Sequence, residues 1–429
     1  MNMPKTVLYV CVGTTSFRET ENAVHFAMDL EKGGFSSHFI AFPFGAQFIR
    51  QNHLSVDELG VCKKDNYRIF TEVCQRIKPD WIFIADAYYF NLWFGPKHIL
   101  DLKWILDNPV GAGFATFDHL CLSLKNTSLP SFNNPTLEDK FKWLNTTDLT
   151  DIMPVLVPCP LGFPTGKSTS EKSSVFHYRR YTEQVQWDET QKKNFKKNIG
   201  LEAEEKLVLF SIARWALLAV QVVTEDLDAW LRHFSRMIEM IFQGVREKTT
   251  LIVISDYPLF LRSTAGRVRI INWESIPFDT YGRFLAASDL FITTNAMSTS
   301  IAQAVMSKVP TGCLTSSGRD FRKNKAIPSE LLAWFETAED RYPDLVRPYL
   351  VFPVGWQEIL TPLFEKNPVT STFEFLDMLD PVGTINVIND LLFNSEKKEA
   401  VFESQRNYIG QIARLAAPQR IMKSLMESF

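Results

Sequence analysis

Continuous hydrophobic runs alternate with amphipathic stretches at the start of the chain. Residues 6–12 read TVLYVCV, an apolar run without polar alternation, which predicts a central strand buried on both faces of a parallel sheet. Residues 20–32 repeat apolar side chains at helical spacing, and Gly33 and Gly34 indicate the end of that helix. Residues 38–42 predict a second strand. Strand, helix and strand in such short succession are typical of a doubly wound α/β sheet.

The same alternation of apolar runs and amphipathic stretches continues along the chain, and a second α/β set begins at Lys206. Before that point we predict strands at 81–85, 110–116 and 153–157, and helices at 66–77 and 95–106. After it we predict strands at 207–212, 251–254, 268–271, 290–293 and 309–314, and helices at 226–245, 279–287, 298–307 and 396–427. The expected fold class is α/β, with two Rossmann-like doubly wound domains.

The length of 429 residues also favours two domains, because one hydrophobic core seldom grows beyond about 250–300 residues. Residues 165–200 are rich in Lys, Ser and Thr and show little periodicity, which indicates the join between the domains. We predict an N-terminal Rossmann-like domain over 1–160, a linker over 161–205, a C-terminal Rossmann-like domain over 206–395 and a final helix over 396–429.

Composition excludes several classes of protein. A net charge of -3 disfavours a broad basic surface for nucleic acid, whose binding rests on phosphate neutralisation. The six Cys form no C-x-x-C pair, so we predict no metal site. The chain begins without signal-peptide features and has no apolar run near the roughly 20 residues that span a bilayer. We therefore expect a cytoplasmic protein without an integral membrane segment.

A candidate anion site follows the strand predicted at 290–293. Ser298, Thr299 and Ser300 open the next helix, where unpaired backbone N–H groups and the positive end of the helix dipole favour a phosphate. Asn295 lies in the preceding turn, and Gln303 lies one turn inside the helix, where its amide could bond a sugar hydroxyl. The alternative is that these hydroxyl groups only cap the helix.

The order of motifs from 207 to 314 resembles the donor-binding region of the GT-B glycosyltransferases. The matching segments are Ser211–Arg214 after a strand, Asn272-Trp273, Ile276-Pro277, the run ASDLFIT at 287–293, the hydroxyl residues 298–300, and Ser307–Pro310. This resemblance implies two Rossmann-like domains that face each other across a cleft, with a nucleotide-sugar held by the second and the acceptor by the first. It also implies that the final helix crosses back to the first domain, and that neither a metal ion nor a separate cofactor is needed.

The resemblance assigns roles to four further residues. Arg214 would bind the donor phosphates, since a guanidinium is always charged and offers several donors; the alternative is a surface ion pair. Trp273 and Ile276 would flank the base; the alternative is packing in the core. Gly13 would allow a tight turn beside the ligand, or would serve turn geometry alone.

A general base is expected in the N-terminal domain, because transfer to a hydroxyl group requires removal of its proton. The candidates are Asp86 and His119, which each follow a predicted strand, and Glu19, which follows the loop after the first strand. His119 is preceded by Asp118 and could accept a proton near neutral pH. A structural role is the alternative for each of them.

Three functions remain open from the sequence. The first is a glycosyltransferase that moves a sugar from a nucleotide-activated donor to a hydroxyl or amine acceptor. The second is an epimerase or hydrolase of a UDP-amino sugar on the same fold. The third is a non-catalytic binding protein, favoured by three differences from the family: Asn295-Ala296-Met297 replaces His-Gly-Gly, Gln303 replaces a glutamate, and residues 13–19 contain no histidine. The donor base, the acceptor and the oligomeric state stay open.

Overall fold

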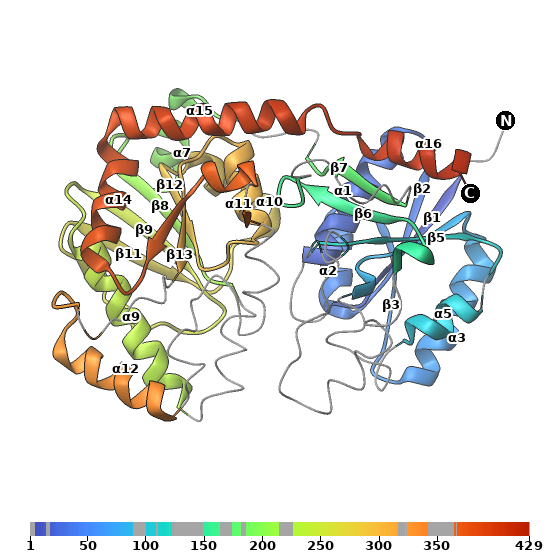
Figure 1. The fold of residues 1–429 in the computed structure, drawn as a ribbon, viewed down its shortest axis with the longest axis horizontal. Coiled ribbons are helices and arrows are strands. Elements are labelled where there is room, and N and C mark those ends of the chain that lie inside the picture. The colour runs from blue at the N-terminus through green and yellow to red at the C-terminus, as the bar shows by residue number, and fades with distance from the viewer. Residues whose placement is uncertain are drawn as a thin grey trace. The chain divides into compact units, whose positions relative to one another are not determined.

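The computed structural model divides into two compact units, drawn in Figure 1. The first unit comprises Met1–Thr182, Thr361–Asn367 and Gln411–Phe429, and the second comprises Glu183–Leu360 and Pro368–Gly410. The structure describes residues 5–13, 18–88, 100–108, 110–119, 121, 123, 149–163, 174–181, 186–213, 226–315, 322, 324–341, 364, 365 and 367–428.

The first unit contains a seven-stranded sheet in which every described pair of strands is parallel. The strand order is β3-β2-β1-β4-β5-β6-β7, so the direction of winding reverses between β1 and β4. The strands are β1 (Thr6–Cys11), β2 (Ser36–Ala41), β3 (Ser55–Glu58), β4 (Trp81–Ile84), β5 (Gly113–Phe117), β6 (Val155–Cys159) and β7 (Val175–Arg179).

Helices connect these strands and build an aromatic core. They are α1 (Arg18–Lys32), α2 (Pro43–Gln51), α3 (Lys63–Ile77), α5 (Leu102–Asp107), the short η2 (Leu149–Asp151) and, from the end of the chain, α16 (Pro418–Ser428). Phe26 of α1 packs against three rings of the sheet, with centroids 5.5 Å from Phe83, 5.2 Å from Phe117 and 5.2 Å from Tyr178. These aromatic residues therefore fill a core.

The second unit contains another seven-stranded sheet, in the order β10-β11-β9-β8-β12-β13-β14. All described pairs are parallel except the short antiparallel pair β10 and β11. Here the winding reverses between β8 and β12. The strands are β8 (Lys206–Ser211), β9 (Thr249–Ile254), β10 (Thr264–Ala265), β11 (Val268–Trp273), β12 (Leu290–Thr293), β13 (Thr311–Thr315) and β14 (Glu374–Asp377).

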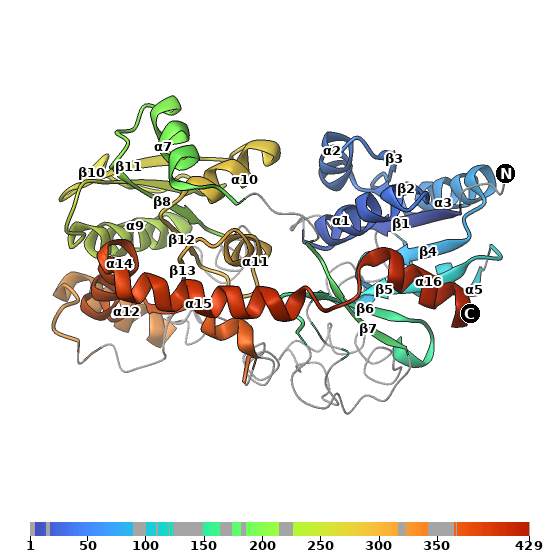
Figure 2. The same ribbon diagram turned by 90° about the horizontal axis from the view of Figure 1, so that it is seen from above.

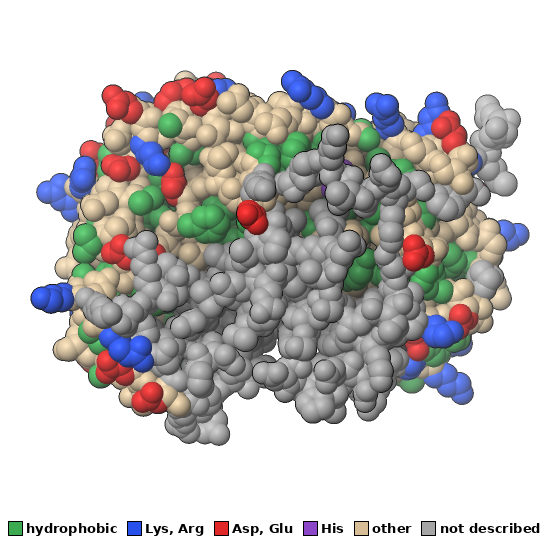
Figure 3. Space-filling view, viewed as in Figure 1, with side chains coloured by type: hydrophobic (Ala, Val, Ile, Leu, Met, Phe, Trp, Pro, Cys, Tyr) green, Lys and Arg blue, Asp and Glu red, His purple; other side chains and the backbone are tan. Residues whose placement is uncertain are grey.

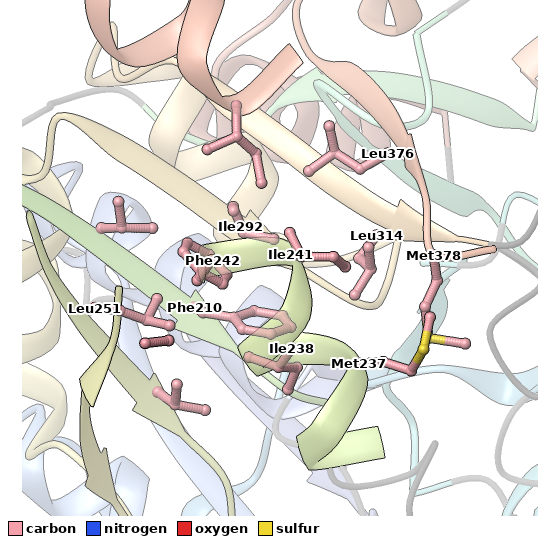
Figure 4. Close-up of a cluster of buried hydrophobic side chains, with 14 of the residues drawn as sticks. Phe210, Met237, Ile238, Ile241, Phe242, Leu251, Ile292, Leu314, Leu376 and Met378 are labelled. Carbon is pink, nitrogen blue, oxygen red and sulfur yellow. The ribbon is translucent and has the colours of Figure 1, made fainter. Parts of the chain in front are cut away.

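Helices cover both faces of the second sheet (Figures 1 and 2). They are α7 (Glu189–Asn198), α9 (Leu227–Gln243), α10 (Phe278–Ala287), α11 (Thr299–Met306), α12 (Ser329–Arg341), α14 (Pro381–Phe393) and α15 (Ser395–Ile412), with η4 (Pro368–Ser371) before β14. Figure 4 shows side chains of α9, among them Ile241 and Phe242, against Phe210, Leu251 and Ile292 of the sheet. This buried apolar cluster holds β8 and β12 in place, and the ends of these two strands carry one group of candidate residues.

Two segments differ from the sequence-based expectation. The predicted linker 161–205 contains β7 and α7, and α7 begins with a capping box in which Asp188 and Gln191 satisfy each other's backbone N–H groups. The predicted final helix is two helices, α15 and α16, because Pro418 cannot continue a helix from the residues before it.

After this break the chain joins the first unit. The Arg179 N–H group of β7 donates to the Ala416 carbonyl oxygen at 3.0 Å, and the Gln419 amide donates to the Asp29 carbonyl oxygen of α1 at 2.5 Å. The helix α16 is therefore part of the packing around α1 and β7.

The described surface has no large area of one charge sign on the face shown in Figure 3, where acidic and basic side chains are interspersed. Among the described helices, none is long and apolar enough to cross a membrane.

Candidate functional site

The two sheets place candidate residues at equivalent positions, the carboxyl ends of strands at each reversal of winding. In open α/β sheets ligands bind outside the carboxyl ends of the strands at this point. In the first unit it is the edge formed by the ends of β1, β4 and β5; in the second it is formed by the ends of β8 and β12. We call these the first-unit edge and the second-unit edge.

Asp86 and His119 form a buried pair at the first-unit edge. Asp86 follows β4 and His119 follows β5. The exposed fractions of these two residues are 2% and 6%, respectively. The Asp86 carboxylate pairs with Nδ1 of His119 and also accepts the His119 backbone N–H at 3.0 Å. The Thr116 hydroxyl of β5, which accepts the Ala87 N–H at 2.8 Å, ties the two strand ends together.

The electrostatics of this pair favour a neutral imidazole. Burial lowers the pKa of His119, and Arg18 and Arg180 act in the same direction, whereas Asp86 raises it. A histidine that is neutral near pH 7 can accept a proton, and its pairing through Nδ1 makes Nε2 the nitrogen that would accept it. The arrangement is that of a general base oriented by a carboxylate.

Glu19 lies at the same edge, directly over Gly13. A Cβ added at Gly13 would lie 1.3 Å from Oε1 of Glu19, so the glycine makes room for this carboxyl group. Glu19 is 1% exposed, and burial raises its pKa to about 8, with a further increase from Asp86. The structure therefore brings Gly13, Glu19, Asp86 and His119 into one region.

A buried ion pair beside this region was not expected from the sequence. Arg180, which follows β7, lies 2.8 Å from the Glu21 carboxylate of α1, and both residues are buried. Asp118, also fully buried, accepts the Ser123 N–H at 2.7 Å. The only feature of the sequence that bears on Glu21 is its position in the first turn of α1, where acidic side chains are favoured.

The described residues of the second-unit edge are uncharged groups that bond their own backbone. Thr294 Oγ1 accepts the Ala213 N–H at 3.3 Å, which joins the segments after β12 and β8. Asn295 Oδ1 accepts the Met297 N–H at 3.0 Å, and Ser298 Oγ accepts the Ser300 N–H at 3.1 Å. Ser298 is thus the N-cap of α11, as the capping alternative predicts.

The remaining residues of α11 leave a partly accessible polar surface. Ser298, Thr299, Ser300 and Gln303 are all half-buried and lie on the first two turns of the helix. The N-cap uses one hydroxyl group and one backbone N–H, so capping and phosphate binding at the same helix start are compatible. Phosphate binding here stays a prediction.

Trp273 and Ile276, which the resemblance assigns to the nucleotide base, lie at the end of β11 and in the segment between β11 and α10. Trp273, at the end of β11, packs edge-on against Phe284 of α10 at a centroid distance of 5.2 Å, and it is half-buried. Ile276 lies half-buried between β11 and α10. The Trp273 contact matches the packing alternative for that ring. Arg214 lies outside the described residues.

No three acidic, histidine or cysteine side chains of the described ranges are arranged to hold a metal ion.

Solved structures share this fold along nearly the whole chain. The glycotransferase of kitacinnamycin has a TM-score of 0.55 at 13% identity, covering 98% of this chain and 99% of that one. The spinosyn rhamnosyltransferase SpnG complexed with thymidine diphosphate has a TM-score of 0.55 at 11% identity, covering 98% and 100%. A putative UDP-N-acetylglucosamine 2-epimerase from Listeria monocytogenes has a TM-score of 0.51 at 13% identity, covering 99% and 98%.

These likenesses confirm the predicted class: the chain has the GT-B fold, with two Rossmann-like domains. The chain belongs to the family described as "Family of unknown function (DUF6365)", whose model matches residues 26–428. Comparison with curated proteins gave no match.

Proposed function

We propose that this protein is a glycosyltransferase that moves a sugar from a nucleotide-activated donor to an acceptor without a metal ion. The observation that carries the proposal is the buried Asp86–His119 pair at the first-unit edge. It supplies an oriented base at the place in the fold where ligands bind. The likeness to glycosyltransferase structures supports the same class of reaction.

In the proposed reaction, Nε2 of His119 removes the proton of an acceptor hydroxyl group as its oxygen attacks the anomeric carbon of the donor. The bond from that carbon to the diphosphate oxygen breaks, and the nucleoside diphosphate leaves with the electron pair. Asp86 stabilises the imidazolium that forms, because a carboxylate beside Nδ1 favours the charged ring.

The donor is assigned to the second unit. The start of α11 offers backbone N–H groups and the hydroxyl groups of Ser298, Thr299 and Ser300, which can stabilise the charge of the departing diphosphate. Arg214 is proposed as the cation for the same phosphates. Gln303 and Asn295 are proposed to bond sugar or ribose hydroxyl groups, and Trp273 and Ile276 to contact the base through their accessible sides.

A thermal-shift experiment with UDP, GDP and TDP tests the donor site. A nucleotide that binds only the folded protein raises the melting temperature, by an amount set by its concentration relative to Kd. We expect one of the three to stabilise the full chain selectively. Arg214→Ala should abolish that shift, whereas Arg246→Ala, at an exposed position in the same unit, should leave it unchanged. No shift with any nucleotide would favour the non-catalytic alternative.

One observation favours a second function, an epimerase or hydrolase of a UDP-amino sugar. Three carboxyl groups, those of Glu19, Asp86 and Asp118, lie with His119 at the first-unit edge, which suits proton transfer at a sugar carbon. One solved structure of the same fold is itself a putative UDP-N-acetylglucosamine 2-epimerase. Incubation with UDP-N-acetylglucosamine alone distinguishes the two functions, because only this one releases or epimerises the sugar without an acceptor.

A further inference from the structure

Two polar side chains of α1 are buried without hydrogen-bond partners among the residues that the structure describes. Glu19 and Asn22 are 1% and 0% exposed, and within the described ranges neither carboxylate oxygen of Glu19 and neither amide atom of Asn22 has a hydrogen-bond partner. They lie three residues apart and therefore on the same side of the helix. Buried polar groups are almost always paired, and each exception needs an explanation.

The neighbouring groups do not supply the missing partner of Glu19. Its own backbone N–H, Arg18 and the Thr20 hydroxyl act to lower the pKa of the carboxyl group, but none forms a hydrogen bond of acceptable geometry with it. Among the described residues, no Lys, Arg or His forms an ion pair with Glu19. An ionised carboxylate in such surroundings is costly unless a cation reaches it.

The charges of the region favour a cation over an anion as that partner. Besides Glu19, the carboxyl groups of Glu21, Asp86 and Asp118 lie at or beside this edge. Two buried guanidinium groups oppose these four carboxyl groups: Arg180 is paired with Glu21, and Arg18 lowers the pKa of Glu19 without a hydrogen bond to either of its carboxylate oxygens. His119 is paired with Asp86. Glu19 is left as a carboxyl group that needs a donor, and an added phosphate or carboxylate would instead meet several like charges.

We propose that the first-unit edge binds a protonated primary amine of the acceptor, with the Glu19 carboxylate and the Asn22 amide oxygen accepting its N–H groups. An ammonium group has three donors and no acceptor, so it matches two neighbouring acceptor groups. Gly13 leaves space for Glu19 at the strand end where ligands bind. The amine serves only for recognition of the acceptor. The reacting group is a hydroxyl group of the same acceptor, which His119 deprotonates. This deprotonation alone rests on the proposed function.

The test compares amines with alcohols of the same skeleton by thermal shift on the full chain, without nucleotide. The probes are ethanolamine against ethylene glycol, and glucosamine against glucose, at matched concentration and ionic strength near pH 7. At least one amine should raise the melting temperature by about 2 °C or more over its alcohol. Equal shifts within both pairs would overturn the proposal, whatever the result with nucleotides.

Two variants locate the effect. Glu19→Gln keeps the shape of the side chain but cannot ionise to the carboxylate that the ammonium group would pair with, and it should abolish the difference between amine and alcohol while any nucleotide shift remains. Glu31→Gln, the same change at an exposed position of α1, should keep the difference. An amine shift retained in Glu19→Gln would overturn the assignment. If an amine stabilises the protein and no nucleotide does, the amine site stands and the glycosyltransferase proposal fails.

Discussion

The two edges occupy the same place in two sheets that share the order of their central parallel strands, yet their described side chains differ in kind. The first-unit edge gathers ionisable groups that are almost completely buried, Glu19, Asp86 and His119. At the second-unit edge the described residues include the neutral side chains of Thr294, Asn295 and Ser298, which bond the backbone around them. The topology fixes where each edge lies, and the side chains decide what it can do.

Under the proposed function, the two edges have separate tasks. Burial raises the pKa of Glu19 and lowers the pKa of His119, and groups with shifted pKa values can exchange protons near neutral pH. Hydroxyl, amide and backbone N–H groups do not titrate in that range, but they can hold a phosphate at a helix start. We therefore propose that proton transfer takes place in the first unit and nucleotide binding in the second.

The largest expected effect comes from His119→Asn. Loss of a general base should lower kcat by about 10²–10⁴-fold, whereas the nucleotide-induced thermal shift should stay unchanged. In the wild type, activity should persist on acidification until the pH falls through a value below 6.5, because the pKa of His119 is lowered.

His53→Asn is the matched control, since His53 is exposed and has a positive φ of 60° that asparagine tolerates. Sugar-transfer rates of the two variants check the prediction. Equal loss in both, or a nucleotide shift lost with His119→Asn, would remove the separation of tasks.

Glu19→Gln should change the dependence of stability on pH. Glu19 has a pKa of about 8 in the folded protein, above its ordinary value of 4.5, so the folded state holds a proton that the unfolded chain releases. Its contribution to stability is therefore present below pH 4.5 and is lost as the pH rises through about 8, by up to about 5 kcal/mol.

Glutamine cannot lose this proton. The melting temperature of Glu19→Gln should exceed that of the wild type by a margin that grows from about pH 5 to about pH 8 and then stays constant. Calorimetry at several pH values checks this. Parallel profiles of the two proteins would show that Glu19 is not buried as described.

Gly13→Ala tests the contact between the first strand end and Glu19. The added Cβ would overlap Oε1 of Glu19, and forcing a group into a packed site costs about 1–3 kcal/mol. In a Glu19→Ala background the overlap is absent, so the same substitution should cost much less. A double-mutant cycle on melting temperatures measures the coupling, and additive effects would contradict the contact.

Ser298→Ala has the smallest expected effect on stability, and it tests the role of the second-unit edge. Loss of the N-cap of α11 should cost about 1 kcal/mol. The nucleotide shift should also decrease if this helix start holds the diphosphate. Asp380→Ala removes the N-cap of α14 and should cost a similar amount without changing the nucleotide shift. Identical nucleotide shifts in both variants would restrict Ser298 to capping.

Much of the sheet architecture could be predicted from continuous apolar runs. The strands β1, β8 and β12 were expected within about a residue of their bounds, because central parallel strands are buried on both faces. The short β3 and β14 were missed, since SVDE and EFLD contain charged residues and no apolar run. The helix α14 was also missed, although Asp380 before Pro381 is a typical helix start.

The site was predictable only where topology alone decides position. The residues directly after two neighbouring parallel strands must lie at one edge, which is why Asp86 and His119 were found together. The ion pair of Arg180 with Glu21 depends on how β7 and α1 pack, and no local pattern records that. The packing of Trp273 on Phe284 likewise depends on tertiary contacts between β11 and α10.

The most direct test of the central claim is a crystal structure of the full chain with the nucleoside diphosphate that stabilises it most. We predict that the diphosphate lies against the start of α11, within hydrogen-bond distance of the backbone between Thr294 and Ser300. A nucleotide bound instead by Asp86 and His119, with the start of α11 unoccupied, would contradict the division of tasks between the two edges.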